Sequence, residues 1–189
     1  KFHAVEIRNY PVLKEFERPS IQGNFLCYTG LLNEHRGVQE MLEVAQQTQV
    51  KINLAGACHS PTLLQQLQQH DFVIHHGHVN RSKIQAIYQQ SFVGLALLHS
   101  GPTFNDSLPI KLFEYMAAGL PVIASDFPLW RDIIERHQCG FCVNPHDVDK
   151  IAELILQLQT NSDEAKQMGL RGKQAIEQCY NWQTQEIKL

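Results

Sequence analysis

Residues 92–125 of the chain read FVGLALLHSGPTFNDSLPIKLFEYMAAGLPVIAS. The almost wholly apolar beginning of this stretch, residues 92–98, predicts a strand in the middle of a parallel sheet. After a polar loop at 100–106, a helix is expected to run to about Ala118, where Gly119 stops it and Pro121 follows. Residues 120–125 then predict the next strand. A strand, a helix and a strand in this order form the repeating unit of a parallel α/β sheet.

The same alternation continues on both sides of this stretch. Further strands are expected at 24–29, 50–55, 72–75 and 141–143, with helices at 37–49, after Ser60, at 82–90 and at 129–136, and two more between Asp147 and Cys179. This order predicts an α/β fold, a doubly wound Rossmann-like parallel sheet of about six strands with helices on both faces. Such sheets bind ligands at the carboxyl ends of their strands, near the switch point. We therefore expect the functional residues in loops 30–37, 56–60, 75–80, 100–106 and 125–128.

Composition excludes several classes of protein. The chain has 189 residues, 43% of them hydrophobic and 19% charged, which is enough for a core and unlike a disordered chain. A net charge of -3 without a dense Lys/Arg run argues against a nucleic-acid partner. The sequence contains no apolar stretch of about 18 residues, so it predicts no membrane-spanning helix.

The cysteines predict neither disulfides nor a metal site. Five cysteines are an odd number, which suits a reducing compartment. Cys139 and Cys142 form a C-x-x-C, but no second pair accompanies it and the motif leads from a helix into a strand. The run His75-His76-Gly77-His78 also invites a metal interpretation, but adjacent histidines on a strand point to opposite faces. We expect no metal site.

The first loop of the sheet is suited to an anion. Gly30 ends the first strand, and Arg36 and Gly37 stand where the next helix begins. Backbone N–H groups, a helix dipole and a guanidinium would meet an anion there. The loop lacks the G-x-G-x-x-G pattern of dinucleotide-binding folds. The alternative, that Arg36 is a surface residue and the glycines only allow the turn, stays open.

The loop and helix at 105–118 carry two carboxylates. Asp106 precedes the helix and Glu114 lies in its second turn, so both can reach the crevice at the strand ends and accept hydrogen bonds from sugar hydroxyls. Leu108, Leu112 and Met116 form the expected buried stripe, with Lys111, Glu114 and Ala118 on another face. On the residues alone a structural interpretation is favoured, in which Asp106 caps the helix and Glu114 pairs with Lys111 at i, i+3.

A family resemblance changes this balance. Residues 105–125 resemble the E-x7-E signature of the group 1, or family four, retaining glycosyltransferases of the GT-B fold, with Asp106 in place of the first glutamate. Residues 25–37 resemble the family's strand, glycine and (Lys/Arg)-Gly block, and residues 73–79 its base-binding strand. Residues 53–56, 121–125, 139–140 and 181–182 also recur in the expected order.

The resemblance implies a role for each matched residue. Glu114 would hold the ribose hydroxyls, Asp106 would face the donor sugar, and Arg36 would neutralise the diphosphate. The family commonly has an arginine after the glycine that is Gly30, where this sequence has Leu31, so Lys111 gains weight as a phosphate contact. The catalytic set is then Asp106, Glu114 and Arg36, and the donor-binding set is Gly30, Arg36, Gly77, His78, Val79, Ser107, Leu108, Lys111 and Glu114.

The resemblance also implies a domain organisation and a reaction. Residues 1–20 resemble an interdomain lead-in and residues 21–189 the donor-binding domain with its C-terminal helices, the C-terminal half of a GT-B fold; the N-terminal acceptor domain is absent. The reaction would transfer a sugar, with retention, from a nucleotide-diphosphate sugar to a glycan or lipid-linked acceptor in polysaccharide biosynthesis. No cofactor or metal is expected, and this chain alone should transfer little or nothing.

The expected location is the cytoplasm, where peripheral contact with the inner face of the membrane would reach a lipid-linked acceptor. Two alternatives to a transferase remain. One is a sugar-nucleotide epimerase of related fold, against which the spacing of Asp106 and Glu114 argues. The other is a nucleotide-binding module without catalysis.

Overall fold

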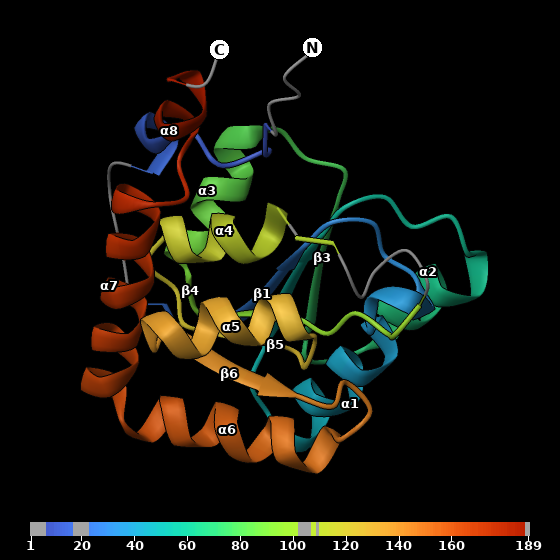
Figure 1. Cartoon of the computed structure of the whole chain (residues 1–189). Coiled ribbons are helices and arrows are strands. Elements are labelled where there is room, and N and C mark those ends of the chain that lie inside the picture. The colour runs from blue at the N-terminus through green and yellow to red at the C-terminus, as the bar shows by residue number, and fades with distance from the viewer. Residues whose placement is uncertain (1–6, 17–22, 102–106, 109, 188–189) are drawn as a thin grey trace.

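A computed structural model describes residues 7–16, 23–101, 107–108 and 110–187 of the chain (Figure 1). Six parallel strands form one sheet in the order β3-β2-β1-β4-β5-β6. The strands are β1 (Phe25–Thr29), β2 (Ile52–Ala55), β3 (Val73–Gly77), β4 (Ser91–Ala96), β5 (Val122–Ser125) and β6 (Gly140–Val143). The doubly wound sheet predicted from the sequence is confirmed, and its switch point lies between β1 and β4.

Helices cover both faces of this sheet (Figure 1). They are η1 (Leu13–Phe16), η2 (Glu34–Arg36), α1 (Val38–Thr48), α2 (Pro61–Gln69), α3 (Arg81–Gln89), α4 (Ile110–Ala117), α5 (Pro128–His137), α6 (Val148–Thr160), α7 (Ser162–Gln178) and α8 (Trp182–Glu186). Buried side chains of α1 and α6 belong to one core cluster, and those of α3, α4 and α5 to another. The two clusters define the two faces of the sheet.

Local sequence signals set the ends of these helices. Ser60 caps α2, since its side-chain oxygen accepts a hydrogen bond from the Leu63 N–H at 3.2 Å, and Pro61 occupies the first helical position. After α4, Gly119 adopts a φ of 74° and its N–H donates to the Met116 carbonyl at 3.0 Å. These are the stops and starts that the sequence predicts.

Two features of burial go beyond what the sequence predicts. Helix α4 is buried on all sides from Leu112 to Ala117 rather than along one stripe, because it lies between the sheet and α7. A Cβ on Gly94 of β4 would come within 2.4 Å of the Tyr115 ring, so helix and strand are in direct contact. In the lead-in, Tyr10 and Phe16 are buried in the core cluster of α4, where Tyr10 packs edge-on against Phe113.

The C-terminal segment holds a helix that the sequence analysis did not expect. Helix α8 lies beside the lead-in, since the Trp182 N–H donates to the Pro11 carbonyl at 3.0 Å. The Arg8 N–H likewise donates to the buried side chain of Gln185 at 3.1 Å. The two ends of the described chain therefore contact each other (Figure 1).

Candidate functional site

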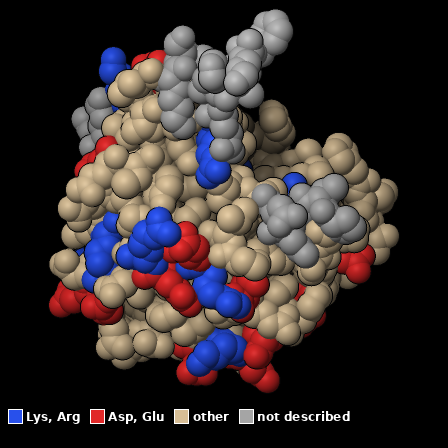
Figure 2. Space-filling model, viewed as in Figure 1, with Lys and Arg blue, Asp and Glu red and all other residues tan. Residues whose placement is uncertain are grey.

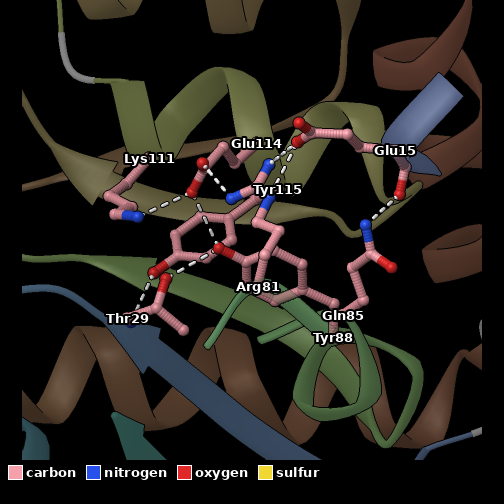
Figure 3. A network of polar contacts seen from close by, with 8 residues as sticks. All are labelled: Glu15, Thr29, Arg81, Gln85, Tyr88, Lys111, Glu114 and Tyr115. Carbon is pink, nitrogen blue, oxygen red and sulfur yellow. Dashed lines mark hydrogen bonds and ion pairs between the residues drawn. The ribbon is translucent and has the colours of Figure 1, made fainter. Parts of the chain in front are cut away.

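The carboxylate of Glu114 lies at the centre of a polar network beneath α4 (Figure 3). Its Oε1 accepts a hydrogen bond from Arg81 Nη1 at 2.6 Å. Its Oε2 accepts from Lys111 Nζ at 2.7 Å and from the Tyr88 hydroxyl at 2.9 Å. The Glu114 side chain is only 8% exposed, so a desolvated carboxylate is held by two cations and a phenol.

This network reaches the carboxyl end of β1. The Tyr88 hydroxyl also lies 2.7 Å from Thr29 Oγ1, and the Thr29 N–H donates to the Tyr115 hydroxyl at 3.2 Å. Thr29 is the last residue of β1, which is one of the two strands at the switch point of the sheet. Glu114 is therefore placed where doubly wound folds bind their ligands.

Arg81 joins Glu114 to the lead-in. Besides the bond to Glu114, Arg81 Nε donates to Glu15 Oε2 at 2.7 Å, and the guanidinium lies 5.1 Å from the centre of the Phe16 ring. Gln85, one turn further along α3, donates to the Glu15 carbonyl. One guanidinium thus serves two carboxylates that belong to different segments of the chain.

The charges of the site decide its protonation. Burial alone would raise the pKa of the Glu114 carboxyl, but Lys111 and then Arg81 outweigh burial and hold that pKa below its usual range. Burial and the negative charge of Glu114 raise the pKa of Tyr88 well above its ordinary value, so the phenol stays a donor. Glu114 is accordingly a carboxylate at neutral pH that can accept hydrogen bonds.

The first loop places Arg36 near the carboxyl end of β1. Arg36 ends η2, whose N-cap Asn33 accepts a hydrogen bond from the Arg36 N–H at 3.1 Å. Burial raises the pKa of Tyr28 to about 12 against the opposing positive charge of Arg36. Tyr28 lies in β1 next to Thr29 but belongs to the core cluster of α1, so Tyr28 and the Glu114 network share this end of the strand on different faces of the sheet.

The glycines of three strand ends adjoin one another. The Gly30 N–H donates to the Ala55 carbonyl and the Gly56 N–H to the Gly77 carbonyl, both at 2.8 Å. Of the residues expected along a base, His78 is exposed and Val79 is half-buried against the core cluster of α4. The structure therefore brings the 30–37 and 75–80 loops to the same edge of the sheet.

The loop before α4 is anchored by a tryptophan. Trp130 of α5, 1% exposed, donates from Nε1 to the Ser107 carbonyl at 2.6 Å. Leu108 is half-buried against the core cluster of α4. Asp106, predicted to face the donor sugar, lies outside the described residues.

Arg81, Tyr88, Thr29 and Glu15 were missed by the sequence analysis. Arg81 could have been identified from the sequence, because this residue directly follows the 75–80 loop and is the first residue of a helix that Asn80 caps. The tyrosine and threonine gave no such signal, since both residue types are ordinary in strands and helices. The ion pair of Lys111 with Glu114 at i, i+3 was predicted from the sequence. It lies at the switch point of the sheet, where the sequence also led us to expect Glu114.

Burial disfavours the thiolate form of both cysteines of the C-x-x-C. All five are free thiols, and burial raises the pKa of Cys139 and of Cys142 to about 12. The motif connects α5 to β6, as the sequence analysis expected. A thiol that resists ionisation is a poor nucleophile and a poor metal ligand.

Charges of both signs are mixed on the face of the molecule in Figure 2. Among the described residues, basic side chains pair with acidic ones of the same or a neighbouring element. The pairs are Arg131 with Asp126, Arg136 with Asp132, Lys150 with Glu153 and Arg171 with Glu164.

None of the helices in the described part of the chain is long and apolar enough to cross a membrane.

Comparison with known proteins identifies the family. The sequence profile described as "Glycosyl transferases group 1" matches residues 13–175, most of the chain. The chain belongs to the group 1 glycosyltransferase family. Over 84 residues it is 30% identical to a GDP-mannose-dependent alpha-(1-6)-phosphatidylinositol monomannoside mannosyltransferase of Mycobacterium tuberculosis, a match that covers 44% of this chain and 22% of that protein.

Two solved structures share the fold of this chain. The C-terminal domain of a glycosyl transferase group 1 family protein from Francisella tularensis gives a TM-score of 0.70 at 20% identity, covering 91% of this chain and 95% of that domain. HepE from Anabaena, solved in complex with UDP, gives a TM-score of 0.78 at 16% identity, covering 96% of this chain and 55% of HepE. The GT-B Rossmann-like domain predicted from the sequence is confirmed.

Proposed function

We propose that this chain is the donor-binding half of a retaining glycosyltransferase, which binds a nucleotide-diphosphate sugar at the carboxyl ends of β1 and β4. The observation that carries the proposal is the buried Glu114 carboxylate at the switch point of a group 1 family fold. A carboxylate in that position is suited to accept hydrogen bonds from the two hydroxyls of a ribose. The relatives named for GDP-mannose or solved with UDP support a nucleotide donor.

Binding of a ribose requires a rearrangement of the network. Glu114 already accepts three hydrogen bonds from Lys111, Arg81 and Tyr88, so a pair of hydroxyls must displace at least one of these donors. Lys111 is the donor best placed to leave, because Arg81 is also bonded to Glu15 and Tyr88 to Thr29, while the Lys111 side chain is 30% exposed. Once released, its ammonium would turn to the diphosphate together with Arg36, and the two cations would stabilise the leaving group.

The remaining steps of the proposal concern the reaction as a whole. Asp106 would face the donor sugar, Ser107 and Leu108 would offer N–H groups to the diphosphate, and Gly77, His78 and Val79 would lie along the base. The sugar would pass to a glycan or lipid-linked acceptor that a separate N-terminal domain binds, with the anomeric configuration retained. The cations of the chain neutralise the diphosphate in this scheme, so transfer needs no metal there. The setting would be cytoplasmic, at the inner face of the membrane for a lipid-linked acceptor.

The decisive experiment measures nucleotide affinity. UDP, GDP and ADP, each with and without its sugar, are titrated into the chain by calorimetry. We expect at least one to bind, and the Glu114→Gln variant to bind it more weakly by about 1–3 kcal/mol, because the ribose hydroxyls lose a charged acceptor. Glu43→Gln, an exposed glutamate of α1, is the matched control. Absence of binding at millimolar nucleotide, or equal affinity of both variants, would refute the ribose assignment.

The phosphate role of Arg36 has its own test. The Arg36→Ala variant should lose affinity for the nucleoside diphosphate while its affinity for the free nucleoside stays the same, because only the former carries the charge that the guanidinium neutralises. Equal losses for both ligands would contradict the assignment.

The stereochemistry of transfer is tested separately. Proton NMR of the product, made with an acceptor domain supplied, shows whether the anomeric configuration is retained. Nucleotide binding without transfer under those conditions would instead identify a non-catalytic module.

A further inference from the structure

A second polar cluster lies at the start of α1, a helix whose buried side chains belong to a different core cluster from those of α4. Glu40 Oε1 lies 2.8 Å from His99 Nε2 and 2.9 Å from His146 Nδ1. The two imidazole rings are 4.3 Å apart between centroids, with their planes 52° apart. The three side chains can each present one ligand atom, and these atoms lie within 4.8 Å of one another. The arrangement is a compact set of two imidazoles and one carboxylate.

The fold brings these residues together from three separate segments. Glu40 lies in the first turn of α1, His99 follows β4, and His146 lies between β6 and α6. The His99 N–H donates to the His35 carbonyl at 2.9 Å, and the His146 N–H donates to Asn144 Oδ1 at 3.1 Å. Both histidines are therefore fixed through their own backbone, independently of the contact with Glu40.

Glu40 is a buried carboxylate that is only half satisfied. The residue is 9% exposed, and its Oε2 is buried without a hydrogen-bond partner among the described residues. Its other oxygen is shared by both histidines. A buried carboxylate oxygen without a partner is costly, and a bound cation is one way to offset that cost.

We propose that Glu40, His99 and His146 bind a divalent transition-metal ion such as Zn²⁺. Imidazole nitrogens with one carboxylate oxygen form the ligand set that zinc accepts, with water in a fourth position. Magnesium and calcium prefer oxygen ligands throughout and fit this set poorly. The His146 side chain is 59% exposed and the His99 side chain 16%, so an ion would enter from the side of His146.

Two of the three separations between ligand atoms need only a small adjustment, and the third pair, the two histidine nitrogens, lies within 4.8 Å. Zinc–ligand distances of about 2.0 Å in a tetrahedron place neighbouring ligand atoms about 3.3 Å apart. The present separations of 2.8 and 2.9 Å therefore open by a few tenths of an ångström when the ion enters. His99 Nε2 and His146 Nδ1 must then be without a proton, since a metal takes the lone pair of a neutral imidazole, and any proton on them is released.

The metal proposal does not rest on the proposed transferase function, although His99 is bonded to His35, the neighbour of Arg36. Glu40 lies on α1, whose buried side chains belong to one core cluster, whereas α4 and Glu114 belong to the other. No metal site was expected from the sequence, because the histidines at 75–78 cannot bind one ion together, His99 lies at another strand end and the C-x-x-C has no second pair. The three ligands proposed here are 59 and 106 residues apart, so no short motif announces them.

The test is a zinc titration of the whole chain. We expect saturable binding of one Zn²⁺ per chain by calorimetry, accompanied by a rise in Tm. Each of the variants His146→Gln, His99→Gln and Glu40→Gln should weaken zinc binding by at least about tenfold, as is typical even for residues that only support a metal ligand. His59→Gln and Cys179→Ser are matched controls, since both residues are exposed and lie outside the cluster; zinc affinity should not change in them.

Co²⁺ as a probe identifies the ligands directly. Visible absorption bands of tetrahedral Co²⁺ that disappear in His146→Gln would support the site, and His146→Gln is the safest variant because the residue is exposed. Circular dichroism confirms that each variant is folded. Absence of saturable zinc binding, wild-type affinity in a folded His146→Gln variant, or a thiolate-to-cobalt charge-transfer band that Cys179→Ser removes would each overturn the proposal. The cluster would then be a hydrogen-bonded His–Glu–His group only.

Discussion

Gly37 is the residue at which the first loop tolerates least change. It adopts a φ of 70°, and a Cβ there would lie 2.0 Å from the Leu97 carbonyl oxygen. Gly37→Ala should therefore lower the free energy of unfolding by more than about 1 kcal/mol, through backbone strain and a backbone clash together. Chemical denaturation measures the change.

Gly77 supplies the control for that prediction. It has a similar φ of 65°, but a Cβ there would meet no atom within 4 Å. Gly77→Ala keeps the strain and omits the clash, so it should cost less than Gly37→Ala. Equal losses would mean that the approach of the loop to β4 contributes nothing to stability.

At the residue scale, the sequence predicted pairs that are close along the chain and missed those that are not. The contact of Lys111 with Glu114 follows from one helical turn, so the spacing alone predicts it. The contacts of Glu114 with Arg81 and Tyr88 span 33 and 26 residues, and they depend on where α3 packs relative to α4. That packing is a tertiary property, and no single-sequence pattern encodes it.

Among the elements, α5 and the loop before α4 are joined by one indole. Trp130→Phe keeps an aromatic ring in the buried position and removes the N–H that donates to the Ser107 carbonyl. We expect a loss of about 1–3 kcal/mol in the free energy of unfolding and faster hydrogen exchange around residues 107–108. Trp182→Phe, the same change at a half-buried position of α8, is the control. Equal effects of the two variants on exchange at 107–108 would contradict the anchoring role.

The elements themselves were largely predictable because their signals are local. All six strands and the helices between them were expected, with ends that differ by one or two residues, such as β4 ending at Ala96 rather than at residue 98. The complete burial of α4 was missed because it comes from a second layer, α7, which periodicity within α4 does not reveal. Helix α8 was missed because five residues are too few for a periodic pattern.

For the whole molecule, the Glu114 network makes stability depend on pH. The native pKa of Glu114 lies below the value of 4.5 that the carboxyl has in an unfolded chain. The native state therefore releases this proton more readily, so the stabilisation is complete above about pH 4.5 and is lost as the pH falls through the native pKa. Burial opposes this shift, but Lys111 and Arg81 outweigh it.

The prediction is checked with the charge removed. Denaturation of the wild type and of Glu114→Gln at neutral pH and at about pH 3 gives the free energy of unfolding of each. We expect the variant to be less stable at neutral pH, by about 1–3 kcal/mol for the lost charged hydrogen bonds, and the difference to shrink in acid. A difference in the free energy of unfolding that stays constant with pH would show that Glu114 has the same pKa in the native and unfolded states.

The strand order has a consequence for how the molecule forms. β1 pairs with β2, which follows it closely in sequence, but also with β4, so that Leu26 lies opposite Val93. Closing that pair orders a long intervening chain, and such non-local contacts fold slowly. Thr29 lies in β1 and Glu114 lies in α4, which follows β4. The candidate site therefore cannot assemble before β1 pairs with β4 in the middle of the sheet. In a refolding experiment, nucleotide binding should therefore be among the last native properties to return.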